Sequence, residues 1–262
     1  MKRDFFQVRV GAGITFFKDH IIKKWNFEDY HSLKDPAVFI GVYDTMDIAA
    51  IRLHRGPKII MFAGADIVNY GGLWRNAPNT FHVSYGPYKK ILESKGVKVT
   101  SHVTPLKNFD FWKPVPLGDK IYVYKGAISE RPTHYMWEEI VEPLIKEFGD
   151  RVIWTKNMPE QQLRDDFYSK CFAYVKPNPT AGSTTMWEMG HMGIRTFTQD
   201  HEDLNFDHTV NYADVDDLIK KLKEESYWIG STRENVAQST KNSLDDNENW
   251  LSLDYYENND SN

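Results

Sequence analysis

The amino-acid sequence predicts an α/β protein made of two Rossmann-like domains. Short apolar runs alternate with segments of helical periodicity along most of the chain, and turns rich in glycine or proline separate them. This alternation stops at residues 108–117, which contain two prolines, and starts again after them. Strands that alternate with helices favour parallel sheets covered by helices. We therefore expect one domain over residues 1–117 and a second over residues 118–262.

The first domain opens with a buried strand over residues 5–10 and a glycine turn at residues 11–13. Apolar side chains then recur at helical spacing as far as residue 25. Residues 69–79 have no period and many turn formers, so we expect an exposed loop there. The remaining strands of this domain are expected at residues 37–43, 58–63, 81–84 and 97–103, and the remaining helices at residues 45–53 and 87–95.

The second domain repeats the alternation from residue 120 onward. Its strands are expected at residues 121–124, 152–155, 171–175 and 194–198, and its helices at residues 135–148, 159–169, 184–192, 214–225 and 231–242.

Composition sets the broad class of protein. The chain has 262 residues, of which 41% are hydrophobic, so it can form substantial cores. Its single cysteine, Cys171, lies in an apolar run and is expected to be a buried small residue. No apolar run is long enough for a membrane span, and the first residues lack the apolar core of a signal peptide. We expect a soluble, cytoplasmic protein without a membrane partner.

The net charge of −5 hides an uneven distribution. Residues 1–117 hold 17 Lys and Arg against 10 Asp and Glu, whereas residues 118–262 hold 15 against 27. The first half is therefore basic and the second acidic. Such asymmetry indicates that the first half meets an anionic partner.

The segment over residues 171–198 carries the strongest functional signal. It reads as strand, turn, helix and strand, and the amides of Ser183, Thr184 and Thr185 fall at the start of the helix. A helix N-terminus offers unpaired N–H groups and positive potential, which suit a phosphate. Glu188, one turn further, would accept hydroxyls of a sugar beside that phosphate. The alternative is that Glu188 is a solvated helix residue and the turn a plain connection.

This segment resembles the donor site of glycosyltransferases of the two-Rossmann-domain (GT-B) architecture, family 4 in particular. Pro177, Glu188 and Gly193 fall on the proline, the second glutamate and the final glycine of the family pattern, whereas Thr180 and Ala181 replace its first glutamate and the following glycine. The resemblance implies two domains facing across a cleft, with a shortened N-terminal domain. It implies a nucleotide sugar, expected to be a uridine diphosphate sugar, on the second domain and an acceptor on the first.

Further residue roles follow from the resemblance. Lys125 and Arg131 lie where such enzymes hold the donor diphosphate, although their order is reversed. The glycine turn would face the cleft, with Gly13 against the donor; a tight turn without a ligand is the alternative. Residues 250–256 would pack back on the other domain.

Two aspartates follow strands of the first domain, where a parallel sheet binds ligands. Asp66 falls where similar family 4 enzymes often carry a histidine or aspartate near the acceptor, so the resemblance implies that it is the catalytic base or positions the acceptor. Asp44 is a second catalytic candidate, and a helix cap is its alternative role. The histidines and the cysteine show no metal-binding spacing, so the expected mechanism needs no metal or cofactor.

The basic first half suggests a nucleic-acid acceptor. Cations pair with phosphates and aromatic rings stack on bases, and both kinds of side chain are mixed over residues 74–98. The expected DNA contacts are Trp74, Arg75, Tyr85, Lys89 and Lys90; the alternative is an ordinary solvated helix face with aromatic residues in the core. Our leading hypothesis is transfer of a hexose or pentose to a hydroxymethylated base in DNA, as bacteriophage DNA-modifying glycosyltransferases do. The alternatives are a glycosyltransferase acting on a saccharide and a non-catalytic nucleotide-sugar-binding module.

Overall fold

The computed structural model divides the chain into two compact units. One comprises Met1–Asn108 with Leu244–Asn262, and the other is Phe109–Ser243. The residues that the structure describes are 3–64, 66–84, 89–101, 106–124, 136–155, 158–177, 184–199, 208–244 and 248–259. This division differs from the boundary expected after residue 117, because residues 109–117 belong to the second unit and the C-terminal segment to the first.

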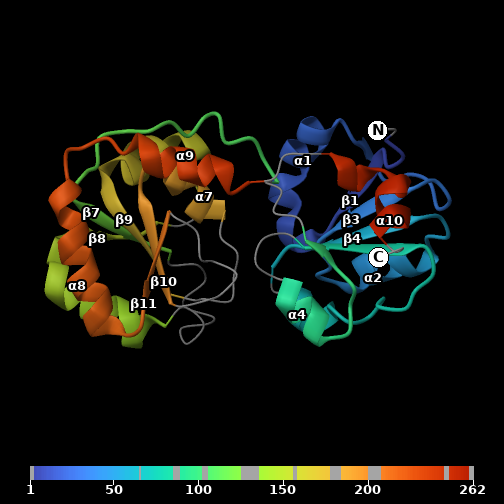
Figure 1. Cartoon of the computed structure of the whole chain (residues 1–262), viewed down its shortest axis with the longest axis horizontal. Coiled ribbons are helices and arrows are strands. Elements are labelled where there is room, and N and C mark those ends of the chain that lie inside the picture. Colours follow the sequence, from blue (N-terminus) through green and yellow to red (C-terminus); the bar gives the residue numbers. More distant parts are fainter. Residues whose placement is uncertain are drawn as a thin grey trace. The chain divides into compact units, whose positions relative to one another are not determined.

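The first unit is built on a parallel sheet. Within the described residues this sheet has six strands in the order β2-β1-β3-β4-β5-β6, and every neighbouring pair is parallel. The strands are β1 (Gln7–Val10), β2 (Glu28–Asp29), β3 (Ala37–Ile40), β4 (Lys58–Phe62), β5 (Thr80–Ser84) and β6 (Thr100–Ser101). Apolar runs such as Ala37–Ile40 are buried along their whole length, as expected for strands covered on both faces. Figure 1 shows β1, β3 and β4 side by side.

Helices cover both faces of this sheet. Ile21 and Trp25 of α1 belong to one apolar core, and Ile51 of α2, Ile67 of α3 and Leu92 of α4 belong to another on the opposite face. The helical segments are η1 (Ala12–Phe17), α1 (Lys18–Trp25), α2 (Thr45–Leu53), α3 (Asp66–Tyr70) and α4 (Lys89–Ser94).

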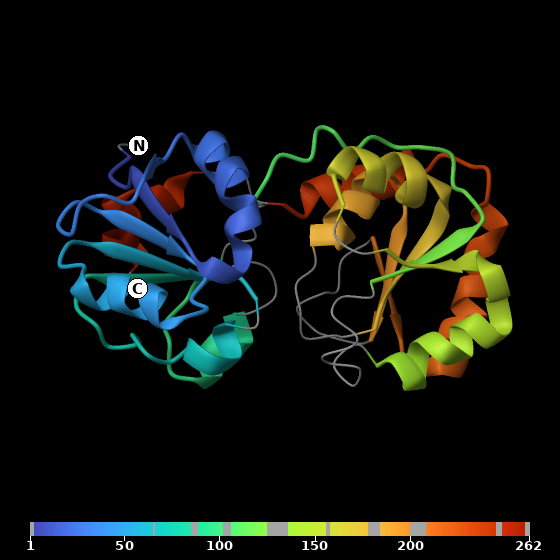
Figure 2. The same cartoon turned by 180° about the vertical axis from the view of Figure 1, so that it is seen from behind.

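The C-terminal segment completes the first unit. It forms η9 (Asn249–Leu251) and α10 (Leu253–Asn259), and Trp250 and Tyr256 join the core beneath α1. The rings of Trp25 and Trp250 meet edge to face with centroids 5.4 Å apart, a favourable aromatic geometry. Figures 1 and 2 both show this red segment beside the blue strands of the first unit. The expectation that residues 250–256 pack back on the first domain is confirmed.

The second unit contains another parallel sheet. Within the described residues its strand order is β11-β10-β9-β7-β8. The strands are β7 (Lys120–Val123), β8 (Val152–Ile153), β9 (Cys171–Lys176), β10 (Arg195–Gln199) and β11 (Thr209–Tyr212). The central strand β9 is buried throughout, and Cys171 is a buried free thiol, as expected.

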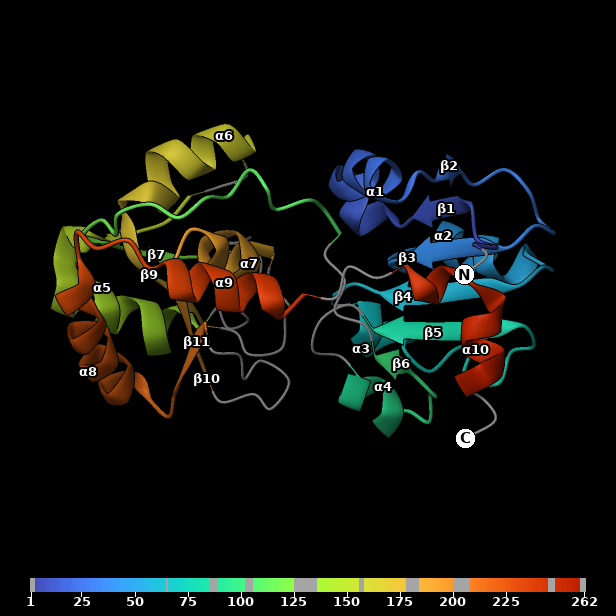
Figure 3. The same ribbon diagram turned by 45° about the horizontal axis from the view of Figure 1, so that its top comes forward.

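Two pairs of helices accompany this second sheet. Figure 3 shows α7 beside α9 and, separately, α5 beside α8, and both pairs are in contact. The helical segments are η3 (Trp137–Val141), α5 (Glu142–Phe148), η4 (Gly149–Arg151), α6 (Glu160–Gln162), η5 (Leu163–Phe167), η6 (Tyr168–Lys170), α7 (Thr184–His191), α8 (Val215–Glu225), η8 (Ser226–Trp228) and α9 (Glu234–Asn242). The helices α7 and α9 approach closely because Gly190 faces Thr240: a Cβ on Gly190 would lie 2.5 Å from the Thr240 hydroxyl.

The elements differ from the sequence-based expectation mainly at the sheet edges. Strands β2 and β11 and the short helix α3 were not expected, and β6 is only two residues long, Thr100–Ser101. The residues of β2 are exposed, and the first three of β11 are half-buried, so neither segment has the apolar run that marks an inner strand.

Candidate functional site

The strand orders locate one candidate ligand edge in each unit. In both sheets the chain moves outward from the first strand to the second and then crosses back to the other side of the first. The reversal falls between β1 and β3 in the first unit and between β7 and β9 in the second. Open parallel sheets bind ligands at the carboxyl ends of the strands flanking such a switch point. The glycine turn follows β1, and the predicted donor segment follows β9.

The loops after β1 and β3 are in direct backbone contact. A Cβ on Gly11 would lie 2.4 Å from the carbonyl oxygen of Gly41, which itself has a positive φ of +79°. A Cβ on Gly13 would lie 2.6 Å from the ring of Tyr43. Only glycine fits this close approach, so the glycine turn has a packing role. Nothing in this geometry tests the predicted contact of Gly13 with the donor.

Asp47 holds these two loops together. Its carboxylate, in a residue only 2% exposed, accepts hydrogen bonds from the amides of Ala12 at 3.2 Å and Tyr43 at 3.0 Å. Arg9 of β1 pairs with the same carboxylate at 3.2 Å. Sequence reasoning missed Asp47. The signal was present in the spacing of Asp44 and Asp47, since an acidic residue three positions after an N-cap often bonds back to the backbone before the helix.

Asp44 is the N-cap of α2. Its carboxylate accepts a hydrogen bond from the amide of Asp47 at 2.8 Å. The capping role considered for Asp44 is thus confirmed. The residue is half-buried at the edge of the sheet, so capping does not exclude a second role. The catalytic role of Asp44 remains a prediction.

Asp66 begins α3 and is buried. Its carboxylate accepts hydrogen bonds from the amides of Val42 at 2.9 Å, Gly64 at 2.8 Å and Ala63 at 3.2 Å. Burial raises the pKa of Asp66 to about 6, and these hydrogen bonds oppose the rise because they stabilise the anion. Both carboxylate oxygens are occupied by backbone groups, so this geometry favours positioning the strand-end loops over direct proton transfer.

In the second unit, helix α7 buries the glutamate that marks the donor segment. Glu188 is 6% exposed. Burial raises the pKa of the Tyr168 and Tyr122 hydroxyls, and the charge of Glu188 adds to the rise. Thr185 accepts a hydrogen bond from the Tyr168 hydroxyl at 3.4 Å. The alternative in which Glu188 is a solvated helix residue is therefore wrong. Burying a carboxylate is costly unless polar groups surround it, so the position of Glu188 is polar as well as buried.

A cation that sequence reasoning overlooked lies at the end of the central strand. Lys176 is the last residue of β9 and is buried beside Thr198 of β10 in the parallel register. Burial lowers the pKa of Lys176 to about 7, because desolvation disfavours the ammonium. Its signal in the sequence is a lysine that directly follows four apolar residues of a strand.

The final glycine of the donor motif ends α7. Gly193 has a φ of +86°, and the amide of Ile194 bonds to the carbonyl of Met189 at 2.9 Å, the pattern of a glycine C-cap. A Cβ on Gly193 would also lie 3.0 Å from the carbonyl oxygen of Arg233. The glycine therefore sets the turn from α7 into β10.

Of the predicted DNA contacts, one lies in the core. Trp74 is 6% exposed and packs with the apolar cluster beneath α3 and α4, so the expectation of an exposed aromatic there is corrected. Arg75 and Lys90 are exposed, and Lys89 pairs with Glu93 at 3.8 Å. The predicted residues Tyr85, Lys125, Arg131 and Ser183 lie outside the described residues.

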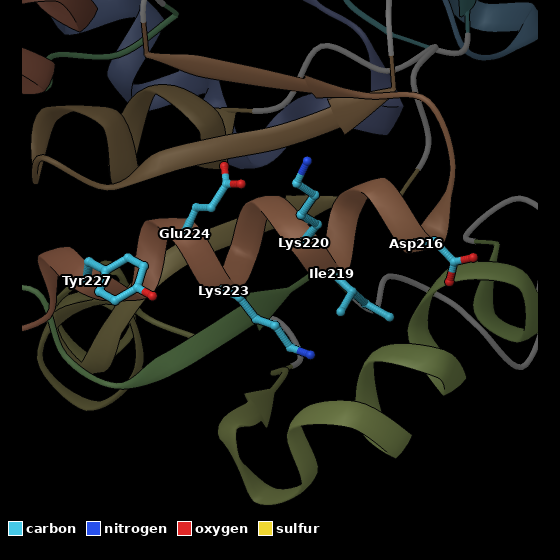
Figure 4. A pocket seen from close by; sticks show the side chains of 6 residues that line it. All are labelled: Asp216, Ile219, Lys220, Lys223, Glu224 and Tyr227. Carbon is cyan, nitrogen blue, oxygen red and sulfur yellow. The ribbon is translucent and has the colours of Figure 1, made fainter.

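A surface hollow lies elsewhere, along helix α8. It has a volume of about 410 Å³ and is lined by Asp216, Ile219, Lys220, Lys223, Glu224 and Tyr227. Figure 4 shows these side chains leaving the helix in several directions rather than converging on one point. A ligand site needs convergent polar groups, so this hollow is not the candidate site.

Among the residues described, no three His, Cys, Asp or Glu side chains are grouped to hold a metal ion. The expectation of a metal-free site stays a prediction. The described helices include none with the length and apolarity to cross a bilayer.

Two parallel α/β units with these strand orders define a fold of the GT-B type, as the sequence predicts. No protein-family model matches the chain, and comparison with curated protein sequences gives no match. Solved glycosyltransferase-type structures do resemble it. Sucrose-phosphate synthase from Thermosynechococcus elongatus aligns with a TM-score of 0.56 at 13% identity, over 94% of this chain and 77% of that one. AviGT4, a glycosyltransferase involved in avilamycin A biosynthesis, aligns with a TM-score of 0.54 at 10% identity, over 96% of both chains. At these identities the likeness concerns the fold.

Proposed function

We propose that this protein transfers a sugar from a nucleotide-sugar donor, expected to be a uridine diphosphate sugar, to a hydroxyl acceptor. One observation carries the proposal. Helix α7 follows the central strand at the carboxyl edge of the second sheet and buries Glu188 one turn from its start, in a fold similar to glycosyltransferases. A carboxylate at that depth suits hydroxyl groups of a bound sugar.

The donor would bind in the second unit. The structure describes α7 from Thr184, and amides at the start of a helix are suited to a diphosphate, which is the role proposed for Thr184 and Thr185. Lys176 adds a cation at the same edge, and an anion beside it would favour its protonated form. The roles of Lys125, Arg131 and Ser183 in holding the diphosphate remain predictions from the sequence.

In the transfer step, the acceptor oxygen forms a bond to the anomeric carbon while the bond from that carbon to the diphosphate oxygen breaks. The bonding electrons stay with the diphosphate, and the hydroxyl proton passes to a base. Cations and helix amides stabilise the charge that develops on the leaving group. We propose Asp66 as the residue that positions the acceptor loops; its role as the base is the sequence-based alternative.

A hydroxymethylated base in DNA is the acceptor that the charge distribution supports. Residues 1–117 carry the basic excess, and Arg75 and Lys90 are exposed in the first unit. Phosphate contacts of this kind make binding strongly dependent on salt. Reversing Lys89 and Lys90 to Glu should weaken DNA binding and flatten its dependence on salt. Unchanged binding would remove these lysines from the proposal.

The proposed function is tested by incubating the protein with a panel of nucleotide sugars and acceptors. Release of nucleoside diphosphate and an acceptor heavier by one sugar, detected by mass spectrometry, are the expected results. A product only with hydroxymethylated DNA supports that acceptor, and a product only with oligosaccharides supports the saccharide alternative. Donor binding without product would indicate a binding module. If no nucleotide sugar binds or reacts, the proposal is wrong.

A further inference from the structure

Three loops at the carboxyl edge of the first sheet, those after β1, β3 and β4, carry carboxylates and have no Lys or Arg in the ranges given next. Residues 11–17, 41–47 and 66–68 follow β1, β3 and β4, and they include Asp44, Asp47 and Asp66 but neither Lys nor Arg. Arg9, inside β1, is paired with Asp47. A phosphate placed against these loops would find no Lys or Arg side chain in them, and it would approach the half-buried carboxylate of Asp44.

The same edge exposes large apolar side chains. Phe16 is 69% exposed, Met46 is 65% exposed and Val68 is 64% exposed. Each of them follows a different strand, and the three strands are neighbours in the sheet. Single exposed apolar residues are common, but these three all follow the carboxyl ends of adjacent parallel strands, the edge where such sheets bind ligands.

The ring of Tyr43 lies against the backbone of this edge. Its ring occupies the space that a side chain at Gly13 or Gly41 would fill, and its hydroxyl lies 3.1 Å from the position of a Cβ on Gly64. These three glycines follow β1, β3 and β4 respectively. The amide of Tyr43 is fixed by Asp47, so the ring is held across the ends of three strands.

We infer that the acceptor enters this edge as an uncharged ring that carries the reactive hydroxyl, with Tyr43 and Phe16 as specificity-determining contacts. Aromatic side chains stack on the apolar face of such a ring, while the carboxylates disfavour phosphate on it. A glycoside ring and a base turned out of DNA share this chemistry, and in DNA the phosphates would lie elsewhere. The inference rests on the proposed function, because it names the acceptor class for the same transfer.

The test compares ring acceptors that differ in charge. The probes are p-nitrophenyl glycosides, the corresponding sugar 6-phosphates, and an oligonucleotide with 5-hydroxymethylcytosine, each tested for turnover with the nucleotide-sugar panel. Binding of the same probes is followed by saturation-transfer NMR, which needs no turnover. We expect binding of a neutral ring, from the glycoside or the oligonucleotide, and at least about tenfold weaker binding of the phosphorylated sugar.

Three variants assign the contact. Phe16→Ala should raise the KM for the neutral ring about three- to tenfold with little change in kcat, which corresponds to the loss of one aromatic contact. Phe16→Lys should improve use of the phosphorylated sugar. Leu53→Ala is the matched control, because Leu53 is 63% exposed but ends α2, on the opposite edge of the sheet.

Tyr43→Phe keeps the packing over the glycines and tests the hydroxyl separately. Preference for the phosphorylated sugar, an unchanged KM in Phe16→Ala, or no NMR signal from any ring probe would each overturn the inference. Turnover with a non-ring alcohol would do so as well while leaving the proposed function intact. Absence of donor binding would instead count against the proposed function.

Discussion

Replacing Asp47 by alanine should loosen the first unit at its ligand edge. The change leaves the amides of Ala12 and Tyr43 without their acceptor and Arg9 without its partner. Each buried polar group that loses its partner costs about 1–3 kcal/mol. Tyr43 is half-buried and Ala12 is exposed, so water replaces part of the lost hydrogen bonding. The expected loss in the free energy of unfolding is therefore about 1–3 kcal/mol, with little added by the partly exposed Arg9.

Asp217 provides a matched control in the second unit. It repeats the same local pattern, since its amide donates to Asp214 at 2.9 Å and its carboxylate accepts from the amide of Ala213 at 3.0 Å. Its side chain is 29% exposed, so water can replace the lost partner. Asp217→Ala should cost about 1 kcal/mol or less.

Hydrogen exchange measured by mass spectrometry reads the two units separately, so a single unfolding transition need not be assumed. Asp47→Ala should speed exchange of Ala12, Tyr43 and the peptides of β1 and β3, without changing peptides from residues 208–243. Equal effects of Asp47→Ala and Asp217→Ala, or a loss below about 1 kcal/mol for Asp47→Ala, would refute the reasoning.

Three further predictions concern the buried carboxylates and the motif glycine. Burial raises the pKa of Asp66 to about 6 from 3.8, so the folded state takes up a proton as the pH falls through 6. The free energy of unfolding of the wild type relative to Asp66→Asn, measured with urea, should therefore rise by up to ~3 kcal/mol from pH 7 to pH 4. A difference between the two proteins that stays constant with pH would contradict this. Glu188→Gln should weaken nucleotide-sugar binding at least about tenfold in calorimetry, whereas the surface change Glu224→Gln should not. Gly193→Ala should lower the free energy of unfolding by about 1–2 kcal/mol because of the positive φ, and by more because the new Cβ would crowd the Arg233 carbonyl. Gly230 also has a positive φ, +83°, but nothing lies near its Cβ position, so Gly230→Ala is the control. Equal losses in the two variants would exclude the effect of the Arg233 carbonyl.

The fold class could be predicted because inner strands and their covering helices leave regular patterns. The run at Ala37–Ile40 and the cap at Asp44 mark β3 and α2 without knowledge of distant contacts. Strand β11 carries no such pattern, because an edge strand is only partly covered. The resemblance predicted that the C-terminal segment packs on the first domain. The contacts that hold it there, such as that between Trp25 and Trp250, could not be read from the sequence.

Only part of the candidate site could be predicted from the sequence. Glu188 was found from the motif, although the sequence could not decide between a buried and a solvated carboxylate. Trp74 was misplaced because its burial depends on side chains of α3 and α4 that come together only in the fold. Asp47 and Lys176 were overlooked because a single acid in a helix and a single lysine in a strand are ordinary residues until burial gives them a role.

The central claim is that a nucleotide sugar binds at the carboxyl edge of the second sheet. It is tested most directly by hydrogen exchange of the full chain with and without each nucleotide sugar of the panel. The account predicts slower exchange in peptides from Cys171–Lys176 and Thr184–His191 with at least one donor, and no change along Val215–Glu225. Protection confined to the first unit or to α8, or none with any donor, would contradict it.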